Sequence, residues 1–219
     1  MTRLRGSAAS AQQPREDGYA AVGRAHCVTD RRRYPLSIDD LVERTVRAAG
    51  AGADVVQVRE RDLPDAELAA LVRRVVAATA SSGARVLVND RFDVAIAAGA
   101  AGVHLRGDSA PASRVRAIVP AGFLIGRSVH SLADVDAAIA DGGCDYLMFG
   151  TVFHSSGKPG GHPVAGLDAL AAACKRSALP VIGIGGITRG RVGDVLAAGA
   201  AGVAAVDMFM CLTPLPEVV

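Results

Sequence analysis

The sequence predicts one α/β domain, a (β/α)8 TIM barrel, and three observations support this prediction. Eight short apolar runs alternate along the chain with longer amphipathic stretches, as buried parallel strands alternate with helices. A motif of the type Ala-Ala-Gly-Ala-Ala-Gly-Val recurs roughly every 50 residues, long enough for two strand–helix units. The chain has 219 residues and is 50% hydrophobic, which suffices for one large core.

Each predicted strand is nearly continuous in apolar residues, as expected of a strand that is buried on both faces. In chain order the predicted strands are 25–29, 55–58, 85–88, 103–105, 124–128, 146–149, 180–184 and 202–206. Copies of the repeated motif lie at 48–56, 97–103 and 197–203, with a weaker copy at 141–146. Each copy marks a helix that ends at glycine before an even-numbered strand. This regularity favours a closed barrel over an open sheet.

Several helix boundaries are also visible in the sequence. Ser37 followed by Asp40 predicts a cap for the first helix, and Gly50 predicts its end. Pro64 suits the first turn of the second helix. Gly166 precedes a stretch whose apolar residues lie on one helical face.

The two ends of the chain depart from the repeating pattern. After the eighth strand only 207–212 precede Thr213-Pro214, so we expect an eighth helix that is short or missing. The apolar seam left there favours a partner subunit, and hence a homodimer. Residues 1–20 are polar and are predicted to be a disordered leader, with the barrel domain spanning 21–219.

Composition and charge exclude several classes of function. Lys+Arg number 24 against Asp+Glu 22, which predicts neither a nucleic-acid partner nor a membrane surface. The basic run 31–33 is read as a solvated loop. No apolar run is long enough to span a bilayer. The four cysteines are dispersed without metal-ligand spacing, which favours reduced thiols and a cytoplasmic location.

Functional side chains of such a barrel are expected where strands end. After the second strand, alternation places Gln57, Arg59 and Arg61 on one face, and this arrangement suits an anion such as a diphosphate. An ion-pair ladder around Glu60 is the alternative interpretation.

Polar residues also follow the third and fifth strands. Asn89 and Asp90 have oxygen atoms suited to Mg²⁺ or to orienting a substrate, although the residues alone favour Asp90 as a cap of the next helix. His130 is a candidate general acid or base, or else a packed histidine, and Ser131 is placed to cap the helix that follows.

Two glycine-rich segments are candidates for phosphate binding. The long loop 150–163 carries Ser155, Ser156 and Lys158, which suit phosphate oxygens, although a mobile surface loop is the alternative. After the seventh strand, Gly185 and Gly186 allow backbone N–H groups to approach a phosphate, with a helix N-terminus behind them.

Together these segments resemble the superfamily of thiamine phosphate synthase and thiazole tautomerase. The matching segments occur in the family's order and are 27–30, 56–61, 88–91, 102–105, 126–131, 145–150 and 180–187. The resemblance extends from residue 25 to about residue 206 and implies a small phosphorylated thiazole or pyrimidine as the substrate.

The synthase branch implies that the diphosphate of a hydroxymethylpyrimidine diphosphate is bound by Arg59, Arg61, Asn89 and Lys158. Asp90 would then help to hold Mg²⁺. That reaction joins the pyrimidine carbon to the nitrogen of thiazole phosphate, with loss of diphosphate. A cationic cluster with Mg²⁺ suits such a leaving group.

Three positions depart from the synthase pattern. Ser109 stands where a second Mg²⁺ carboxylate is expected, and Asp108 lies one place early. Ser155 and Gly157 replace two threonines in the loop after the sixth strand. Asp207 replaces a small hydroxyl residue at the end of the eighth strand, where a carboxylate repels phosphate unless it is protonated or turned away.

The segment 126–131 is closer to the tautomerase pattern, in which the histidine at the position of His130 resembles a proton shuttle and needs no cofactor. Ser128 in the same segment is a candidate contact for the substrate phosphate. The main expectation is therefore a thiazole tautomerase acting on a thiazole carboxylate phosphate. A Mg²⁺-dependent synthase and a non-catalytic, metabolite-binding barrel are the alternatives.

Overall fold

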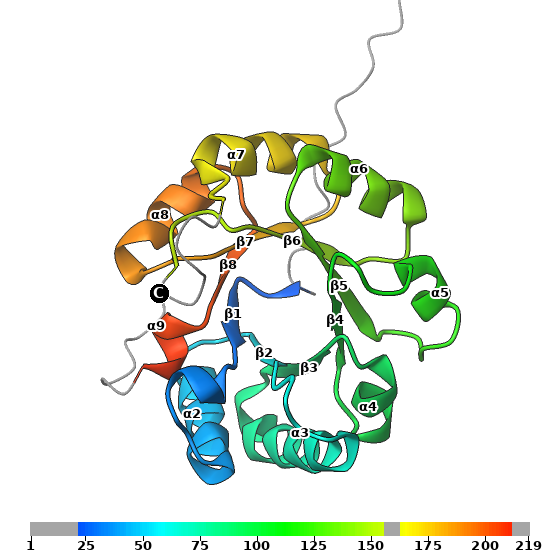
Figure 1. Cartoon of the computed structure of the whole chain (residues 1–219), viewed down its shortest axis with the longest axis vertical. Coiled ribbons are helices and arrows are strands. Elements are labelled where there is room, and N and C mark those ends of the chain that lie inside the picture. Colours follow the sequence, from blue (N-terminus) through cyan, green and yellow to red (C-terminus); the bar gives the residue numbers. More distant parts are fainter. Residues whose placement is uncertain (1–21, 156–162, 212–219) are drawn as a thin grey trace, which may run out of the picture.

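The structure, a computed structural model, describes residues 22–155 and 163–211 and shows a closed barrel of eight parallel strands (Figure 1). Each strand pairs with its neighbours in sequence, and β8 closes the barrel by pairing with β1. The strands are β1 (Ala25–Val28), β2 (Val55–Val58), β3 (Arg85–Asn89), β4 (Gly102–Leu105), β5 (Leu124–Val129), β6 (Tyr146–Phe149), β7 (Val181–Ile184) and β8 (Gly202–Ala205). The predicted fold class is confirmed.

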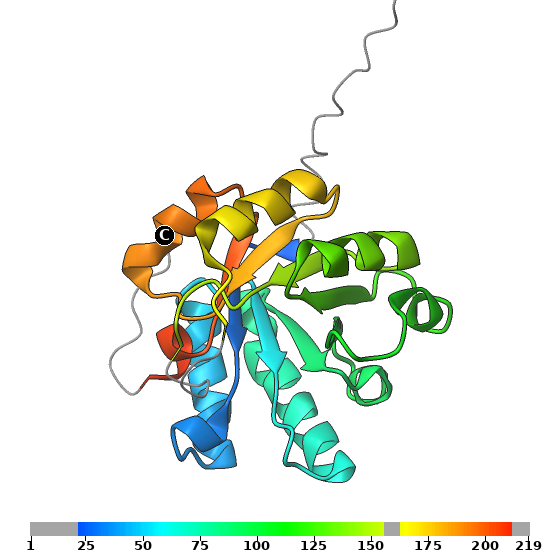
Figure 2. The ribbon, with the colours of Figure 1, turned by 45° about the horizontal axis from the view of Figure 1, so that its top comes forward.

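Helices surround the strands as an outer ring, which the tilted view shows from a second side (Figure 2). They are α2 (Ile38–Gly50), α3 (Asp65–Thr79), α4 (Phe92–Ala97), α5 (Ala112–Arg116), α6 (Leu132–Asp141), α7 (Gly166–Arg176), α8 (Arg189–Ala197) and α9 (Asp207–Met210). Two short 3-10 helices, η1 (Arg31–Arg33) and η2 (Ala80–Ser82), complete the described elements. Within the described ranges, no helix is both long and apolar enough to cross a membrane.

Apolar side chains fill two regions, one inside the barrel and one between the strands and the helices. The inner cluster contains Leu87, Tyr146, Met148 and Ile182, while the outward-facing residues of the strands pack against the helices. Strand glycines make room for large neighbours. A Cβ on Gly126 would lie 2.1 Å from the ring of Tyr146, its partner in the β5–β6 register. A glycine at this position therefore allows the bulky Tyr146 to enter the barrel.

The predicted helix boundaries are largely confirmed. Ser37 and Asp40 form a capping box at the start of α2, which ends at Gly50. Ser131 and Asp134 form the same motif at α6. Pro64 is the N-cap of α3 and thus lies just before its first turn.

Asp90 is not a helix cap, because Arg91 occupies the N-cap position of α4. Asp90 instead takes a left-handed backbone conformation, with φ of 65°. Aspartate tolerates this region better than most residues because its short side chain bonds locally. The turn directs the chain out of β3 before α4 begins.

The eighth helix is short, as predicted: α9 has four residues and packs against α2 and β1 (Figure 1). Its Phe209 and Met210 are fully buried in the main core. The expected exposed seam is therefore wrong for these two residues, because the chain covers them itself. The homodimer that was inferred from that seam stays a prediction, and residues 212–219 lie outside the described part.

Two further expectations concern the N-terminal region. Residues 1–21 lie outside the described residues, so the disordered leader over 1–20 stays a prediction. The basic run Arg31–Arg33 is not simply a solvated loop. It forms η1, in which Arg31 pairs with Asp62 at 2.5 Å and Arg33 with Asp207 at 2.7 Å.

Candidate active site

A cavity of about 880 Å³ opens at the carboxyl ends of the strands. It brings together most of the residues that the sequence singled out, namely Gln57, Arg59, Arg61, Asn89, Ser128, His130, Ser155, Gly185 and Gly186. Asp90 is not among the lining residues. Ser156 and Lys158 lie outside the described residues. In such barrels this end of the strands carries the active site.

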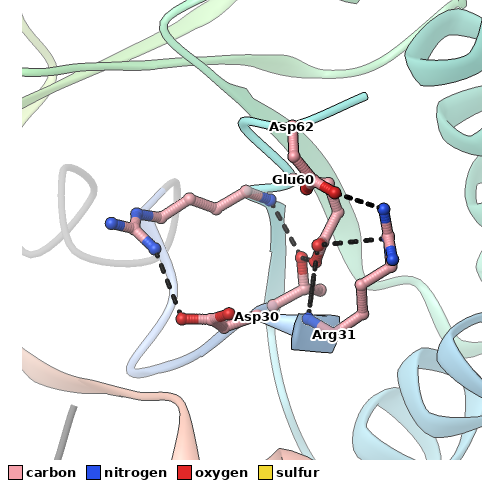
Figure 3. Close-up of polar contacts among 6 residues, drawn as sticks. Asp30, Arg31, Glu60 and Asp62 are labelled. Atoms are coloured by element: carbon pink, nitrogen blue, oxygen red, sulfur yellow. Dashed lines mark hydrogen bonds and ion pairs between the residues drawn. The ribbon is translucent and has the colours of Figure 1, made fainter. Parts of the chain in front are cut away.

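The ends of β1 and β2 are tied together by Glu60, which is 4% exposed (Figure 3). Its carboxylate accepts hydrogen bonds from the Thr29 hydroxyl at 2.6 Å and from the backbone N–H of Arg31 at 3.2 Å. The Thr29 hydroxyl oxygen in turn accepts from the backbone N–H of Arg59 at 2.9 Å. Burial raises the pKa of Glu60, and these donors oppose that rise. The network therefore fixes the backbone from which Arg59 projects.

Glu60 forms an ion pair with Arg31 at 3.8 Å, so the ion-pair ladder that was the alternative interpretation begins there and does not include Arg59. The guanidinium of Arg59 faces Asp30, with 3.7 Å between the charged atoms. Both residues line the cavity. Burial lowers the pKa of Arg59, and the positive charges of Arg61 and Arg106 add to that effect. Arg61 and Arg106 thus lie close enough to Arg59 to repel its guanidinium group. Such a concentration of positive charge suits a polyanionic ligand.

An amide pair lies beside these arginines. The side-chain N–H of Gln57 donates to the amide oxygen of Asn89 at 3.2 Å. Gln57 is 2% exposed, and its Oε1 is buried without a hydrogen-bond partner. A buried acceptor without a partner is costly, so a donor from a ligand in the cavity would satisfy it.

The surroundings of Asp90 do not fit the expected metal site. One carboxylate oxygen of Asp90 accepts a hydrogen bond from Ser109, and the other lies 3.6 Å from the guanidinium of Arg106. The same guanidinium pairs with Asp108. The guanidinium of Arg106 therefore pairs with both carboxylates, as a metal ion bound between them would. Among the described residues no cluster of three or more metal-ligating side chains occurs.

His130 is held at the cavity wall by the start of α6. Its backbone N–H donates to Asp134 at 2.8 Å, and the Asp134 carboxylate also completes the capping box with Ser131. The ring Nδ1 bonds the carbonyl oxygen of Gly150. A carbonyl oxygen only accepts, so His130 Nδ1 carries a proton and donates to it.

The β7 edge contributes close backbone packing. Gly185 and Gly186 have φ of 104° and 62°, which favours glycine. A Cβ on Gly186 would lie 2.2 Å from the carbonyl oxygen of His154. The two glycines thus let the β6 and β7 loops approach each other at the cavity wall.

Asp207 is paired rather than directed alone into the cavity. It accepts hydrogen bonds from Arg33 at 2.7 Å and from the Tyr34 hydroxyl. The positive charge of Arg33 offsets the repulsion that an unpaired carboxylate would exert on a phosphate.

Sequence reasoning assigned no role to His104, although it lies in the quoted segment 102–105. His104 lies on β4, is 2% exposed and lines the cavity. Its Nε2 bonds the Ser128 hydroxyl at 2.8 Å, and its Nδ1 bonds the Tyr146 hydroxyl at 3.0 Å. A histidine inside an apolar strand was the available signal. The partners are 24 and 42 residues away, so only the barrel register shows them.

Comparisons with known proteins show the family of this chain. A family model described as thiamine monophosphate synthase matches residues 25–209. The thiamine-phosphate synthase of Methanoculleus marisnigri is 46% identical over 160 residues, which cover 73% of this chain and 75% of the relative. A putative thiamine-phosphate synthase of Geobacter sulfurreducens is 42% identical over 186 residues, which cover 84% and 85%.

A solved structure is similar over nearly the whole chain. The thiamine phosphate pyrophosphorylase from Pyrococcus furiosus superposes with a TM-score of 0.77 at 31% identity, covering 88% of this chain and 89% of that one. The family match spans every strand of the barrel described above. The chain therefore belongs to the thiamine monophosphate synthase family.

Proposed function

We propose that the protein is a thiamine phosphate synthase, which joins hydroxymethylpyrimidine diphosphate to thiazole phosphate. The observation that carries this proposal is the cluster of Arg59, Arg61 and Arg106 beside the Gln57–Asn89 amide pair. The arginines match a diphosphate, and the unpartnered Gln57 Oε1 matches a hydrogen-bond donor on a nitrogen heterocycle. The relatives named above carry the synthase name.

In this reaction the bond between the pyrimidine methylene carbon and the diphosphate oxygen breaks. The diphosphate leaves with the electron pair, and the thiazole nitrogen forms the new bond to carbon. Negative charge therefore grows on the leaving oxygen. Guanidinium groups that are already held in place at the cavity stabilise this charge without reorganising. Arg59 is held in this way by Asp30 and by the Thr29–Glu60 network.

The synthase branch normally uses Mg²⁺, with Asp90 as one ligand. In this chain Arg106 bridges Asp90 and Asp108, and Ser109 is bonded to Asp90. We therefore assign neutralisation of the diphosphate to the arginines. Asp90 serves to orient Arg106 and Ser109 rather than to face the substrate.

The main expectation of a tautomerase is not confirmed, because the relatives named above carry the name of the synthase. The proposal gives His130 a supporting role at the cavity wall, held by Asp134 and Gly150. An arginine cluster of this size exceeds what one phosphate monoester needs, which also favours a diphosphate substrate.

The two reactions can be assayed side by side on the purified protein. We expect thiamine phosphate from the pyrimidine diphosphate and thiazole phosphate, and no conversion of the thiazole carboxylate phosphate. Conversion of the carboxylate by folded protein that makes no thiamine phosphate would establish the tautomerase instead. Absence of both activities would support the non-catalytic barrel.

A further inference from the structure

A buried polar chain leads from the barrel interior to the cavity. Tyr146 is fully buried, and its hydroxyl bonds His104 Nδ1 at 3.0 Å. His104 Nε2 then bonds the Ser128 hydroxyl at 2.8 Å, and Ser128 lines the cavity. In the described part of the chain, each of the two hydroxyls has His104 as its only hydrogen-bond partner.

The charge state of His104 follows from its position. Burial lowers the pKa of His104 to about 3, and the positive charges of Arg127 and Arg59 act in the same direction. The ring is therefore neutral at physiological pH. A neutral imidazole has one N–H donor and one acceptor nitrogen, so its two bonds have opposite directions.

The Tyr146 hydroxyl decides between the two possible directions. Its proton needs an acceptor, and His104 Nδ1 is the one within reach in the described structure. If Nδ1 carried the proton, the tyrosine proton would be buried without a partner, which is strongly disfavoured. Tyr146 therefore donates to Nδ1, Nε2 carries the imidazole proton, and Nε2–H donates to the Ser128 oxygen.

We infer that Tyr146, through His104, positions the Ser128 hydroxyl so that it faces the cavity as a hydrogen-bond donor to an anionic oxygen of the substrate. The Ser128 oxygen already accepts a hydrogen bond from His104, so the hydroxyl proton of Ser128 is free to be donated to another group. Ser128 lines the cavity, so that acceptor is an atom of a ligand in the cavity. Arg59 and Arg127, the two arginines that act on His104, also line the cavity. The assignment of the acceptor to a diphosphate or phosphate oxygen rests on the proposed function. The direction of the hydrogen bonds from Tyr146 through His104 to Ser128 does not rest on that function.

Tyr146 itself is held in place by the barrel. Its ring lies over Gly126, where a Cβ would lie 2.4 Å from the tyrosine oxygen. The rings of Tyr146 and His26 form a T-shaped pair, with 5.3 Å between their centroids. The hydroxyl therefore has one available position. Tyr146 and His104 are positioning residues, because Ser128 is the member that reaches the ligand.

The first arm of the test measures the tautomer of His104 by ¹⁵N NMR of the histidine side chains. The signal is assigned by its loss in His104→Gln. We expect a lone pair at Nδ1, a proton at Nε2, and no titration between about pH 5 and pH 8. A proton at Nδ1, or titration within that range, would overturn the inference. This arm needs only the wild-type protein and His104→Gln. It therefore tests the inference even if Tyr146→Phe fails to fold.

The second arm measures binding of inorganic diphosphate by calorimetry. We expect Tyr146→Phe and Ser128→Ala each to weaken binding about tenfold, the effect of losing one charge-assisted hydrogen bond. The double variant should bind no more weakly than Ser128→Ala alone, because both changes remove the same bond. Wild-type affinity in Tyr146→Phe, or losses that multiply in the double variant, would contradict the proposal.

Thr45→Val is the matched control, since Thr45 is equally buried and its hydroxyl donates to the carbonyl of Val42 at 2.7 Å. It removes a buried hydroxyl in α2 that does not line the cavity, so diphosphate binding should remain at the wild-type level. Neither arm measures synthesis of thiamine phosphate. Failure of the proposed function is therefore distinguishable from failure of this inference.

Discussion

Arg106 lies between two carboxylates, Asp90 and Asp108, and its side chain is 44% exposed at the cavity. Two neighbouring carboxylates in a site that binds diphosphate usually suggest a bound metal ion between them. Here the cation belongs to the chain itself. Mg²⁺ should consequently matter less for diphosphate binding than the family pattern implies.

We expect the wild-type protein to bind inorganic diphosphate in EDTA within about tenfold of its affinity in Mg²⁺, as measured by calorimetry. Arg106→Gln should weaken the binding in EDTA by a further tenfold or so, because one charge-assisted contact is lost. Arg114→Gln, an exposed position on α5, is the control and should bind normally. Undetectable binding by the wild type without Mg²⁺ would contradict this role of Arg106.

Arg59 offers a second test at the scale of the residue. We expect Arg59→Gln to lower kcat/KM of thiamine phosphate synthesis by about 100-fold, because a fixed positive charge opposite the leaving group is removed. Arg73→Gln, which is exposed on α3, keeps the same substitution away from the cavity. Equal activity of the two variants would exclude Arg59 from the reaction.

The sequence predicted which residues after the strands lie at the cavity. It did not predict contacts between residues that lie far apart in the sequence. Alternation along β2 correctly placed Gln57, Arg59 and Arg61 at one cavity. It did not show that Arg106 engages Asp90, because that contact joins two separate loops. The ion pair of Asp207 with Arg33 likewise joins the segments that follow β8 and β1, which lie side by side because the barrel closes.

At the scale of the element, two capping boxes offer a matched comparison. Ser37 begins α2 and Ser131 begins α6 with the same pair of hydrogen bonds. At α6 the Asp134 carboxylate also accepts from the backbone N–H of His130, which lines the cavity. The second box therefore supports the site as well as a helix.

We expect Ser37→Ala and Ser131→Ala each to lower the free energy of unfolding by about 1 kcal/mol in urea denaturation. Only Ser131→Ala should also alter KM or kcat, since it loosens Asp134 and the loop that holds His130. Identical kinetics for both variants would show that the α6 cap has no influence on the site.

The order and type of the elements could be predicted because each signal is local. Strand apolarity, the caps at Ser37 and Ser131 and the glycine before even-numbered strands all act within a few residues. The need for glycine at Gly126 was not predictable in this way. It depends on the register that sets Gly126 opposite Tyr146, and register is a property of the closed barrel.

At the scale of the whole molecule, two buried histidines couple stability to pH. Burial lowers the pKa of His26 to about 4 and that of His104 to about 3. In the unfolded chain both histidines have a pKa near the ordinary value of 6.5. Between that pH and the lower pKa values of the folded state, the unfolded chain therefore binds more protons than the folded protein. The stabilisation is complete above pH 6.5 and is lost as the pH falls towards 4.

We therefore expect the free energy of unfolding to fall by about 2.7 kcal/mol per pH unit near pH 5 from these two groups. His26→Gln should halve that contribution, because only one of the two protons remains. Thr45→Val, which removes a buried hydroxyl and no titratable group, should leave the slope unchanged. Urea denaturation across pH 4.5 to about 7 measures the slope, and a wild-type slope equal to that of His26→Gln would contradict this linkage.

The most direct measurement of the proposed activity quantifies both products of one reaction. Purified protein is incubated with hydroxymethylpyrimidine diphosphate and thiazole phosphate, in Mg²⁺ and in EDTA, and thiamine phosphate and diphosphate are measured together. We expect the two products in equal amounts, with Arg59→Gln strongly impaired. Release of diphosphate without thiamine phosphate, or no reaction from folded protein, would contradict the assignment as a synthase.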